Sequence, residues 1–182
     1  MSKIGIFMAD GCEEIEGLTV VDVVRRANQE IVMISITGKK EIIGSHGIVF
    51  HADVLADEVD YAALDGIVLP GGMPGTLRLG ESEIVNKVIR KFAQEEKLVA
   101  AICAAPSVLG TAELLKGRAA TCHPGFEEKL VGAIVCEKPV VADQNIITSR
   151  GMGTAIPFAL AIVQYFADEK TVEELKAALI FV

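Results

Sequence analysis

A short apolar run followed at once by a cysteine is the feature that most constrains the fold of this chain. Residues 98–102 contain no Gly, Pro or charged side chain, which is typical of a strand buried on both faces of a parallel sheet. Cys103 follows, and Pro106 stands where a helix takes its first turn, because proline has no amide hydrogen to lose there. The stretch predicts a switch from strand to helix at Cys103, at the carboxyl edge of a sheet.

Two interpretations of Cys103 follow from this position. Open α/β sheets bind their ligands at that edge, and the dipole of a helix N-terminus favours a thiolate. Free cysteine is also among the most buried residue types and commonly behaves as a small hydrophobic side chain. Position alone therefore leaves both a nucleophile and a core thiol open.

Composition favours one globular α/β domain over residues 1–182. Hydrophobic residues make up 51% of the 182 residues and charged residues 23%, which suits a folded chain with a sizeable core. Aromatic residues are only 5%, without Trp, so the core must be built from Val, Ile, Leu and Ala. These residues are typical of a parallel sheet covered by helices.

Charge and cysteine usage exclude several classes of partner and site. A net charge of -8 argues against nucleic acid, and no apolar run is long enough for a membrane span. The four cysteines, at positions 12, 103, 122 and 136, form no CxxC pair, which argues against a zinc ribbon or a thioredoxin-type site. Lys3 and Asp10 bracket too short an apolar stretch for a signal peptide. We therefore expect free thiols in a reducing cytoplasm.

Strands and helices are expected to alternate along the chain. Periodicity and turn residues predict strands at 3–9, 30–37, 67–69, 98–102, 119–123, 133–137, 140–142 and 146–149, a hairpin of 41–43 with 48–51, and helices at 12–28, after Ser82, at 106–116, at 154–167 and after Thr171. Ser82 and Thr154 are expected N-caps, and Thr171 opens a capping-box pattern. This order predicts a doubly wound α/β fold with a mostly parallel sheet and helices on both faces.

Polar groups follow four of the expected strands. Glu16 lies after the first, the Gly71-Gly72 loop after the third, Cys103 after the fourth and His123 after the next. Because the carboxyl ends of parallel strands share one edge, we expect these groups to converge, which favours a reactive Cys103. The alternative for Glu13, Glu14 and Glu16 is that acidic residues merely favour a helix start.

The expected cluster is chemically coherent. A protonated Glu16 would donate a hydrogen bond to the thiolate of Cys103, whereas an ionised carboxylate would raise the pKa of the thiol. The amides of Gly72 and Ala104 would hold a developing oxyanion. His123 is either a proton relay or a hydrogen-bonded neighbour without a chemical role.

Several motifs together resemble one superfamily. Residues 9–16, 68–72 and 100–106, the pair His123-Pro124 and residues 148–154 stand in the order and at the spacing of the ThiJ/PfpI superfamily. More narrowly, they resemble the branch that contains the human Parkinson-disease protein deglycase. The resemblance runs from residue 3 to about residue 180.

This resemblance implies a single ThiJ/PfpI-type domain with a flavodoxin-like fold, usually a homodimer. It implies Cys103 as nucleophile, Glu16 as its carboxyl partner and the amides of Gly71, Gly72 and Ala104 as the anion pocket, without cofactor or metal. The implied activities are conversion of methylglyoxal to lactate and deglycation of early methylglyoxal adducts, so the partners are a small aldehyde or a glycated protein.

The superfamily also offers alternatives. Oxidation of Cys103 to a sulfinic acid would make the chain a non-catalytic redox sensor or a chaperone of the oxidative stress response. A PfpI-type cysteine peptidase would carry His after the nucleophile, where this chain has Ala104. Related amidotransferases need a late His, and none follows His123.

Three further features of the sequence bear on the site. His46 stands where relatives often carry Arg, which would make the anion pocket less cationic at neutral pH. Cys12 would lie either at the rim of the pocket or, without a role, at the helix start. A metal bound by Cys122, His123 and Cys136 is a weaker hypothesis, because strand alternation sends the first two to opposite faces.

Overall fold

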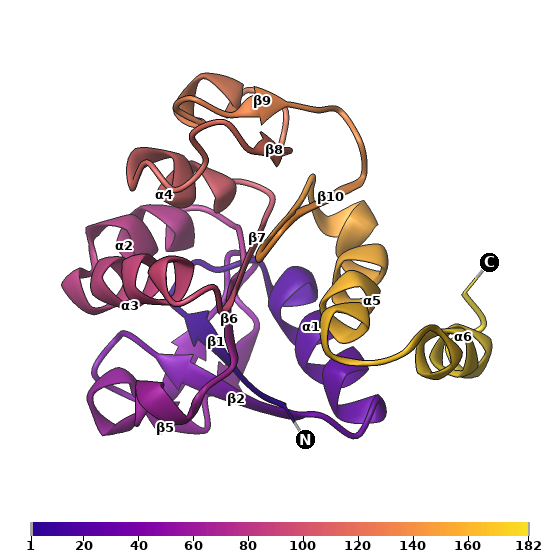
Figure 1. Ribbon diagram of the computed structural model, residues 1–182. Helices are drawn as coiled ribbons and strands as arrows, with labels where there is room; N and C mark the ends of the chain where they lie inside the picture. Colours follow the sequence, from indigo (N-terminus) through magenta and orange to yellow (C-terminus); the bar gives the residue numbers. More distant parts are fainter. Residues whose placement is uncertain (1, 182) are drawn as a thin grey trace.

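A seven-stranded sheet runs through the middle of the molecule, which we describe over residues 2–181 in a computed structural model (Figure 1). The strand order is β10-β11-β7-β6-β1-β2-β5, and every neighbouring pair is parallel except β10 with β11. The strands of this sheet are β1 Lys3–Met8, β2 Glu30–Ser35, β5 Val54–Leu55, β6 Gly66–Leu69, β7 Leu98–Ile102, β10 Val140–Asp143 and β11 Ile146–Ser149.

Helices cover both faces of this sheet. Figure 1 shows α1, α5 and α6 on one side and α2, α3 and α4 on the other. Their bounds are α1 Glu14–Arg26, α2 Gly75–Glu81, α3 Glu83–Gln94, α4 Pro106–Thr111, α5 Ala155–Phe166 and α6 Glu169–Ala178, with short 3-10 turns at Ala56–Glu58, Tyr61–Ala63, Glu127–Lys129 and Met152–Thr154. Within residues 2–181, none of the helices is both long and apolar enough to cross a membrane.

The buried strand β7 divides the core as its sequence predicts. Leu98, Ala100 and Ile102 pack in the cluster that contains the apolar residues of α1 and α5, while Val99 and Ala101 pack in the cluster beneath α3 and α4. Successive side chains of a strand point to opposite faces, so an all-apolar strand can serve two cores at once. Burial on both faces explains why this run tolerates no polar residue.

The predicted fold class is confirmed. The sheet is mostly parallel, the fold is flavodoxin-like, and residues 41–51 form the expected antiparallel hairpin of β3 Glu41–Ile43 and β4 Val49–His51. Ser82 caps α3, as predicted, by accepting the N–H of Val85.

The helix predicted at 106–116 was wrong in length. α4 ends at Thr111, and Glu113 adopts a left-handed conformation with φ 61. The N–H of Glu113 donates to Gly110 O and that of Leu114 to Leu109 O, so these bonds satisfy the last carbonyl groups of the helix. Gly110 packs directly on the backbone of Lys129, which leaves no room for a side chain at that position.

The strand predicted at 119–123 was also wrong. Only β8 Ala119–Ala120 forms, and it pairs in parallel with β9 Ile134–Val135 in a separate two-stranded sheet. The chain therefore reaches His123 through a loop instead of along a strand of the main sheet. A local apolar pattern cannot specify which of several strands will be its partner.

Two predicted helix starts need correction. Asp168, not Thr171, caps α6, because its carboxylate accepts the N–H of Thr171 at 2.9 Å. Thr154 makes no side-chain capping bond for α5. Its hydroxyl lies instead 2.8 Å from Gly151 O and 2.7 Å from Ser149 Oγ, where it holds the preceding loop.

Candidate active site

Cys103 stands on a strained turn immediately after β7. Its φ of 66 lies in the left-handed region, which is uncommon for a residue with a side chain. The surroundings hold this conformation, because Cys103 N–H donates to Ser149 O at 2.9 Å and Cys103 O accepts the N–H of His123 at 2.8 Å. Such strained positions are frequent at functional sites. Cys103 itself is half-buried.

Glu16, in the first turn of α1, lies beside this thiol. Its carboxyl group is 1% exposed, hydrogen-bonds the Cys103 thiol and accepts the N–H of Gly71 at 2.9 Å through Oε2. A Cβ on Gly71 would lie 2.5 Å from Cys103 Cβ and 2.6 Å from Glu16 Oε2. Glycine at 71 is therefore what allows the acid and the thiol to approach each other.

The three amides predicted to bind an anion are at the site but divide their work. The N–H groups of Gly72 and Ala104 point at the Cys103 sulfur, where they stabilise negative charge. The N–H of Gly71 is directed to Glu16 instead. Gly72 has φ 89, and its backbone packs against that of Glu13, so a side chain would not fit there. Because α4 is only six residues long, we attribute the stabilisation of negative charge on the sulfur to these direct amide contacts and not to the dipole of the helix.

The thiol and the carboxyl group influence each other's titration. Burial raises the pKa of Glu16 to about 7, although hydrogen bonds from Cys103 and Gly71 lower it. Burial, and after it the charge of Glu16, raises the pKa of Cys103 to about 12 against the lowering effect of the two amides. This is opposite to the lowered pKa expected from a helix start alone. The pair therefore retains one proton over a wide range above neutral pH.

His123 joins the site by a route that its sequence context did not predict. Besides donating its N–H to Cys103 O, it places its Nδ1 2.9 Å from Pro124 O. A carbonyl group only accepts, so Nδ1 carries a proton in this bond, and in the neutral ring the lone pair is on Nε2. The peptidase hypothesis predicts a carboxylate near His123; the hydrogen-bond partner of its Nδ1 is the carbonyl group of Pro124.

Sequence reasoning missed Gly151, which follows β11 at the same edge of the sheet. A Cβ on Gly151 would lie within 4 Å of Cys103, Glu16 and His123. The pairing of β11 with β7 explains this position, since Ser149 is in register with Ile102. The Arg-Gly sequence directly after a buried strand was the signal available for finding it.

Cys12 and His46 have roles outside the thiol pocket. Cys12 is 0% exposed in the core, so of the two predicted positions the helix start without a chemical role fits the structure. The side chain of His46 is 70% exposed, and its Nδ1 lies 3.2 Å from Glu14 Oε2 and 3.3 Å from Glu13 Oε2. The hydrogen bond to Glu14, then the charge of Glu13, raises the pKa of His46. His46 thereby ties the β3–β4 hairpin to the start of α1.

One group of metal-ligating side chains occurs among the residues that the structure describes. The donor atoms of Glu13, Glu14 and His46 lie within 4.8 Å of one another. Glu14 Oε1 already accepts the N–H groups of His46 and Ile48, at 2.8 and 3.4 Å, so these contacts anchor the hairpin without an ion. Cys122, His123 and Cys136 form no such group within residues 2–181.

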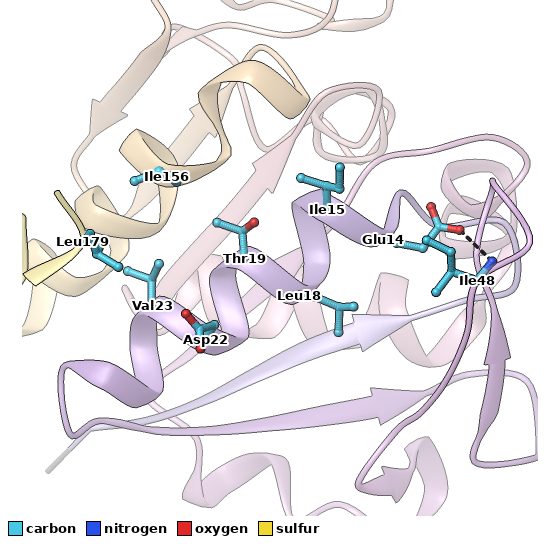
Figure 2. Close-up of a pocket in the computed structure, with 9 residues that line it drawn as sticks. All are labelled: Glu14, Ile15, Leu18, Thr19, Asp22, Val23, Ile48, Ile156 and Leu179. Carbon is cyan, nitrogen blue, oxygen red and sulfur yellow. Dashed lines mark hydrogen bonds between the residues drawn. The ribbon is translucent and has the colours of Figure 1, made fainter. Parts of the chain in front are cut away.

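A second concave region is separate from the thiol. A groove of about 420 Å³ runs along α1, next to α5, α6 and the hairpin (Figure 2). Figure 2 shows that its wall is mostly aliphatic; the lining residues are Glu14, Ile15, Leu18, Thr19, Asp22, Val23, Ile48, Ile156 and Leu179. Cys103, Glu16 and His123 do not line it, so it offers apolar contact but no nucleophile.

Comparison with known proteins shows similarity in sequence and in fold. The model of the DJ-1/PfpI family matches residues 2–165. The chain is 39% identical to Protein DJ-1 homolog B of Arabidopsis thaliana over 95% of its own length, but it spans only 40% of that relative. It is 34% identical to Deglycase TK1284 of Thermococcus kodakarensis over 83% of this chain and 91% of that protein. The solved structure of oxidized Toxoplasma gondii DJ-1 superposes with a TM-score of 0.96 at 32% identity, covering 100% of both chains. The chain therefore belongs to the DJ-1/PfpI family.

Proposed function

We propose that the protein is a cofactor-independent glyoxalase or deglycase that acts on methylglyoxal or on its early protein adducts. The observation that carries this proposal is the contact between Cys103 and the buried Glu16 carboxyl, with the amides of Gly72 and Ala104 at the sulfur. The name of the Thermococcus kodakarensis relative supports the deglycase branch of the proposal.

The first step is addition of the Cys103 thiolate to the aldehyde carbon. A C–S bond forms, the C=O double bond becomes an alkoxide, and the proton of Glu16 passes to that oxygen to give a hemithioacetal. The pKa of Glu16 near 7 suits this role, because the group can both donate and accept at neutral pH. The amide N–H groups of Gly72 and Ala104, which contact the sulfur, would stabilise the alkoxide formed beside it.

The second step moves a hydrogen between the two oxidised carbons. Ionised Glu16 removes the proton from the former aldehyde carbon, and the electron pair moves toward the ketone oxygen to give an enediolate. The hydroxyl proton of the former aldehyde carbon passes to that oxygen, Glu16 returns its proton to the neighbouring carbon, and the former aldehyde carbon becomes the thioester C=O. The product is a lactoyl thioester on Cys103. Water then cleaves the C–S bond, releasing lactate and the free thiol, so that methylglyoxal and one water account for every atom. His123, whose Nδ1 is bonded to Pro124 O, would accept a proton from that water through Nε2.

Lactate production from methylglyoxal tests the proposal. We expect Cys103→Ala to lower turnover to the uncatalysed rate and Glu16→Gln to reduce kcat by about 10²–10⁴-fold, the usual contribution of a general acid–base group. Glu13→Gln is the matched control, since its carboxylate affects Glu16 only through charge. Equal turnover by wild type and Cys103→Ala would contradict the proposed mechanism.

A second candidate function uses the same thiol without turnover. The two amides at the sulfur, with protonated Glu16, are also suitable donors to a sulfinate, so oxidation of Cys103 would signal stress. The Toxoplasma gondii relative was solved as an oxidized protein, which favours this alternative for relatives. Absence of lactate from wild type, with a gain of two oxygens on Cys103 under mild peroxide, would support the sensor and contradict the enzyme.

We also propose a homodimer that covers the groove along α1. Ile15 and Ile48 are 51% and 54% exposed there. Burial of these two side chains against a second copy of the chain would contribute favourable free energy that their exposure to water forgoes. Ile15→Glu should shift the sedimentation mass from dimer to monomer, and a wild-type monomer at micromolar concentration would contradict this proposal. Residence in the cytoplasm stays a prediction from the four free thiols.

A further inference from the structure

The loop after β11 places a residue without a side chain directly over the reacting groups. A Cβ built on Gly151 would lie 3.6 Å from His123 Cδ2, 3.9 Å from Cys103 Sγ and 3.9 Å from Glu16 Oε1, and these are its nearest neighbours. Such separations are ordinary van der Waals contacts. The missing side chain therefore leaves a space for about one carbon atom, which touches the nucleophile, the acid and the imidazole together.

The fold does not require glycine at this position. At Gly71 and Gly72 a Cβ would collide with the backbone or with Glu16. At Gly151 the φ of 160 is extended backbone that any residue adopts, and a Cβ would meet no atom closer than 3.6 Å. Neither packing nor backbone conformation requires glycine at position 151. The effect of glycine there is therefore the open space that it leaves.

Hydrogen bonds hold the space in place. Gly151 N–H donates to Thr154 Oγ1 at 3.1 Å, and Gly151 O accepts the N–H of Thr154 at 2.8 Å. The hydroxyl of Thr154 also lies 2.7 Å from Ser149 Oγ, and Ser149 O accepts the N–H of Cys103. Because this network ties the loop to the nucleophile turn, an added methyl group at residue 151 could not simply move aside.

We propose that Gly151 determines the size of the compound that can react with Cys103. The methyl group of methylglyoxal, on the carbon next to the attacked atom, lies in the space over Gly151. This suits a small free α-oxoaldehyde and leaves no room beside it for a protein side chain, so the inference narrows the proposed function to its glyoxalase branch. Where it names the substrate, this inference rests on the proposed function. As a statement about access to the thiol, it stands on the geometry alone.

Alkylation of Cys103 tests access without relying on turnover. Gly151→Ala is compared with Gly153→Ala, a matched control in the same loop whose Cβ would meet nothing within 4 Å. The probes are iodoacetamide, which is slim, and N-ethylmaleimide, which is a ring; peptide mass spectrometry follows Cys103, with Cys136 as internal reference. We expect Gly151→Ala to slow the maleimide about tenfold more than the iodoacetamide, in line with one carbon in a tight pocket. Gly153→Ala should match wild type.

Three results would overturn the inference: wild-type rates with both reagents in Gly151→Ala, equal slowing of both, or the same change in Gly153→Ala. Thermal melts of both variants show whether either has lost its fold. A larger exchange, Gly151→Val, should extend the block to iodoacetamide, and its failure to do so would count against a size limit.

Turnover gives the substrate arm of the test. Gly151→Ala should lose about tenfold more kcat/KM with methylglyoxal than with glyoxal, which lacks the methyl group. An equal loss with both aldehydes contradicts the assignment of the space to the substituent. Wild type without turnover of either aldehyde contradicts the proposed function, and the ratio of alkylation rates then still decides the role of Gly151.

Discussion

Two cysteines follow parallel strands of the same sheet, yet their surroundings differ completely. Cys12 comes shortly after β1 and Cys103 directly after β7, each just before a helix. Cys12 is 0% exposed, and its backbone is enclosed by Gly75 and by the hairpin, with Ser45 N–H donating to Cys12 O. Cys103 is half-buried, with a carboxyl group, two amides and an imidazole around it.

The comparison teaches that a position at the sheet edge does not by itself make a reactive thiol. Burial raises the pKa of both thiols to about 12. Of the two, only Cys103 is half-buried and has a carboxyl group in contact, because α1, the Gly71-Gly72 loop and the loop after β11 all reach it. Other segments of the chain, not the local strand–helix switch, therefore create the site.

The largest expected difference between the two thiols is their rate of alkylation. At about pH 8, iodoacetamide should modify Cys103 at least about 100-fold faster than Cys12, because Cys12 reacts only when the structure opens locally. The Cys103 rate should rise through an inflection near 7, where the pair with Glu16 loses its first proton. Peptide mapping over a pH series measures both rates.

Glu16→Gln sharpens this test, since glutamine cannot titrate. The inflection near 7 should disappear in the variant, while Cys12 stays protected. Comparable labelling of Cys12 and Cys103 in wild type would contradict the proposed difference in reactivity between the two thiols. An unchanged pH profile in Glu16→Gln would show that Glu16 does not control the thiol.

A smaller effect is expected on stability. Burial raises the pKa of Glu16 to about 7 in the folded protein, whereas an unfolded glutamate titrates near about 4.3. The folded state binds more protons between these values, so stability is lost as pH rises through that window. Glu16→Gln should therefore be more stable than wild type at about pH 8, by at most about 4 kcal/mol, and equal to it near pH 4.

Urea unfolding at the two pH values measures this difference. Cys12→Ala is the control, because Cys12 lies outside the carboxyl pair and its replacement should change stability by a similar amount at both pH values. A Glu16→Gln variant less stable than wild type at both would mean that the hydrogen bond to Gly71 outweighs the burial of charge.

Local pattern predicted much of the fold because burial acts on each strand separately. The apolar run of β7 and the capping serine of α3 both carry their own physical signal, and both were right. The end of α4 could not be predicted from the local sequence. Gly110 and the turn at Glu113 end the helix where a distant segment, at Lys129, packs against it. That contact is absent from the local sequence.

The candidate site shows the same division. The topology of a parallel sheet was enough to expect Glu16, the Gly71-Gly72 loop and Cys103 at one edge, and the structure brings them into contact. His123 also reaches the site, but through its own N–H bond to Cys103 O instead of at a strand end. Gly151 went unnoticed because a glycine signals backbone freedom in a sequence, and not the space that it leaves.

By itself, the sequence determined the alternation of strands and helices, the buried strand before Cys103 and the family to which the chain belongs, because hydrophobic periodicity and motif order are properties of the chain alone. Only the tertiary structure decided which cysteine has a carboxyl partner, which amides face the sulfur and where the space over Gly151 opens. These features depend on contacts between segments far apart in the chain, and such contacts exist only after the sheet has brought its strand ends together.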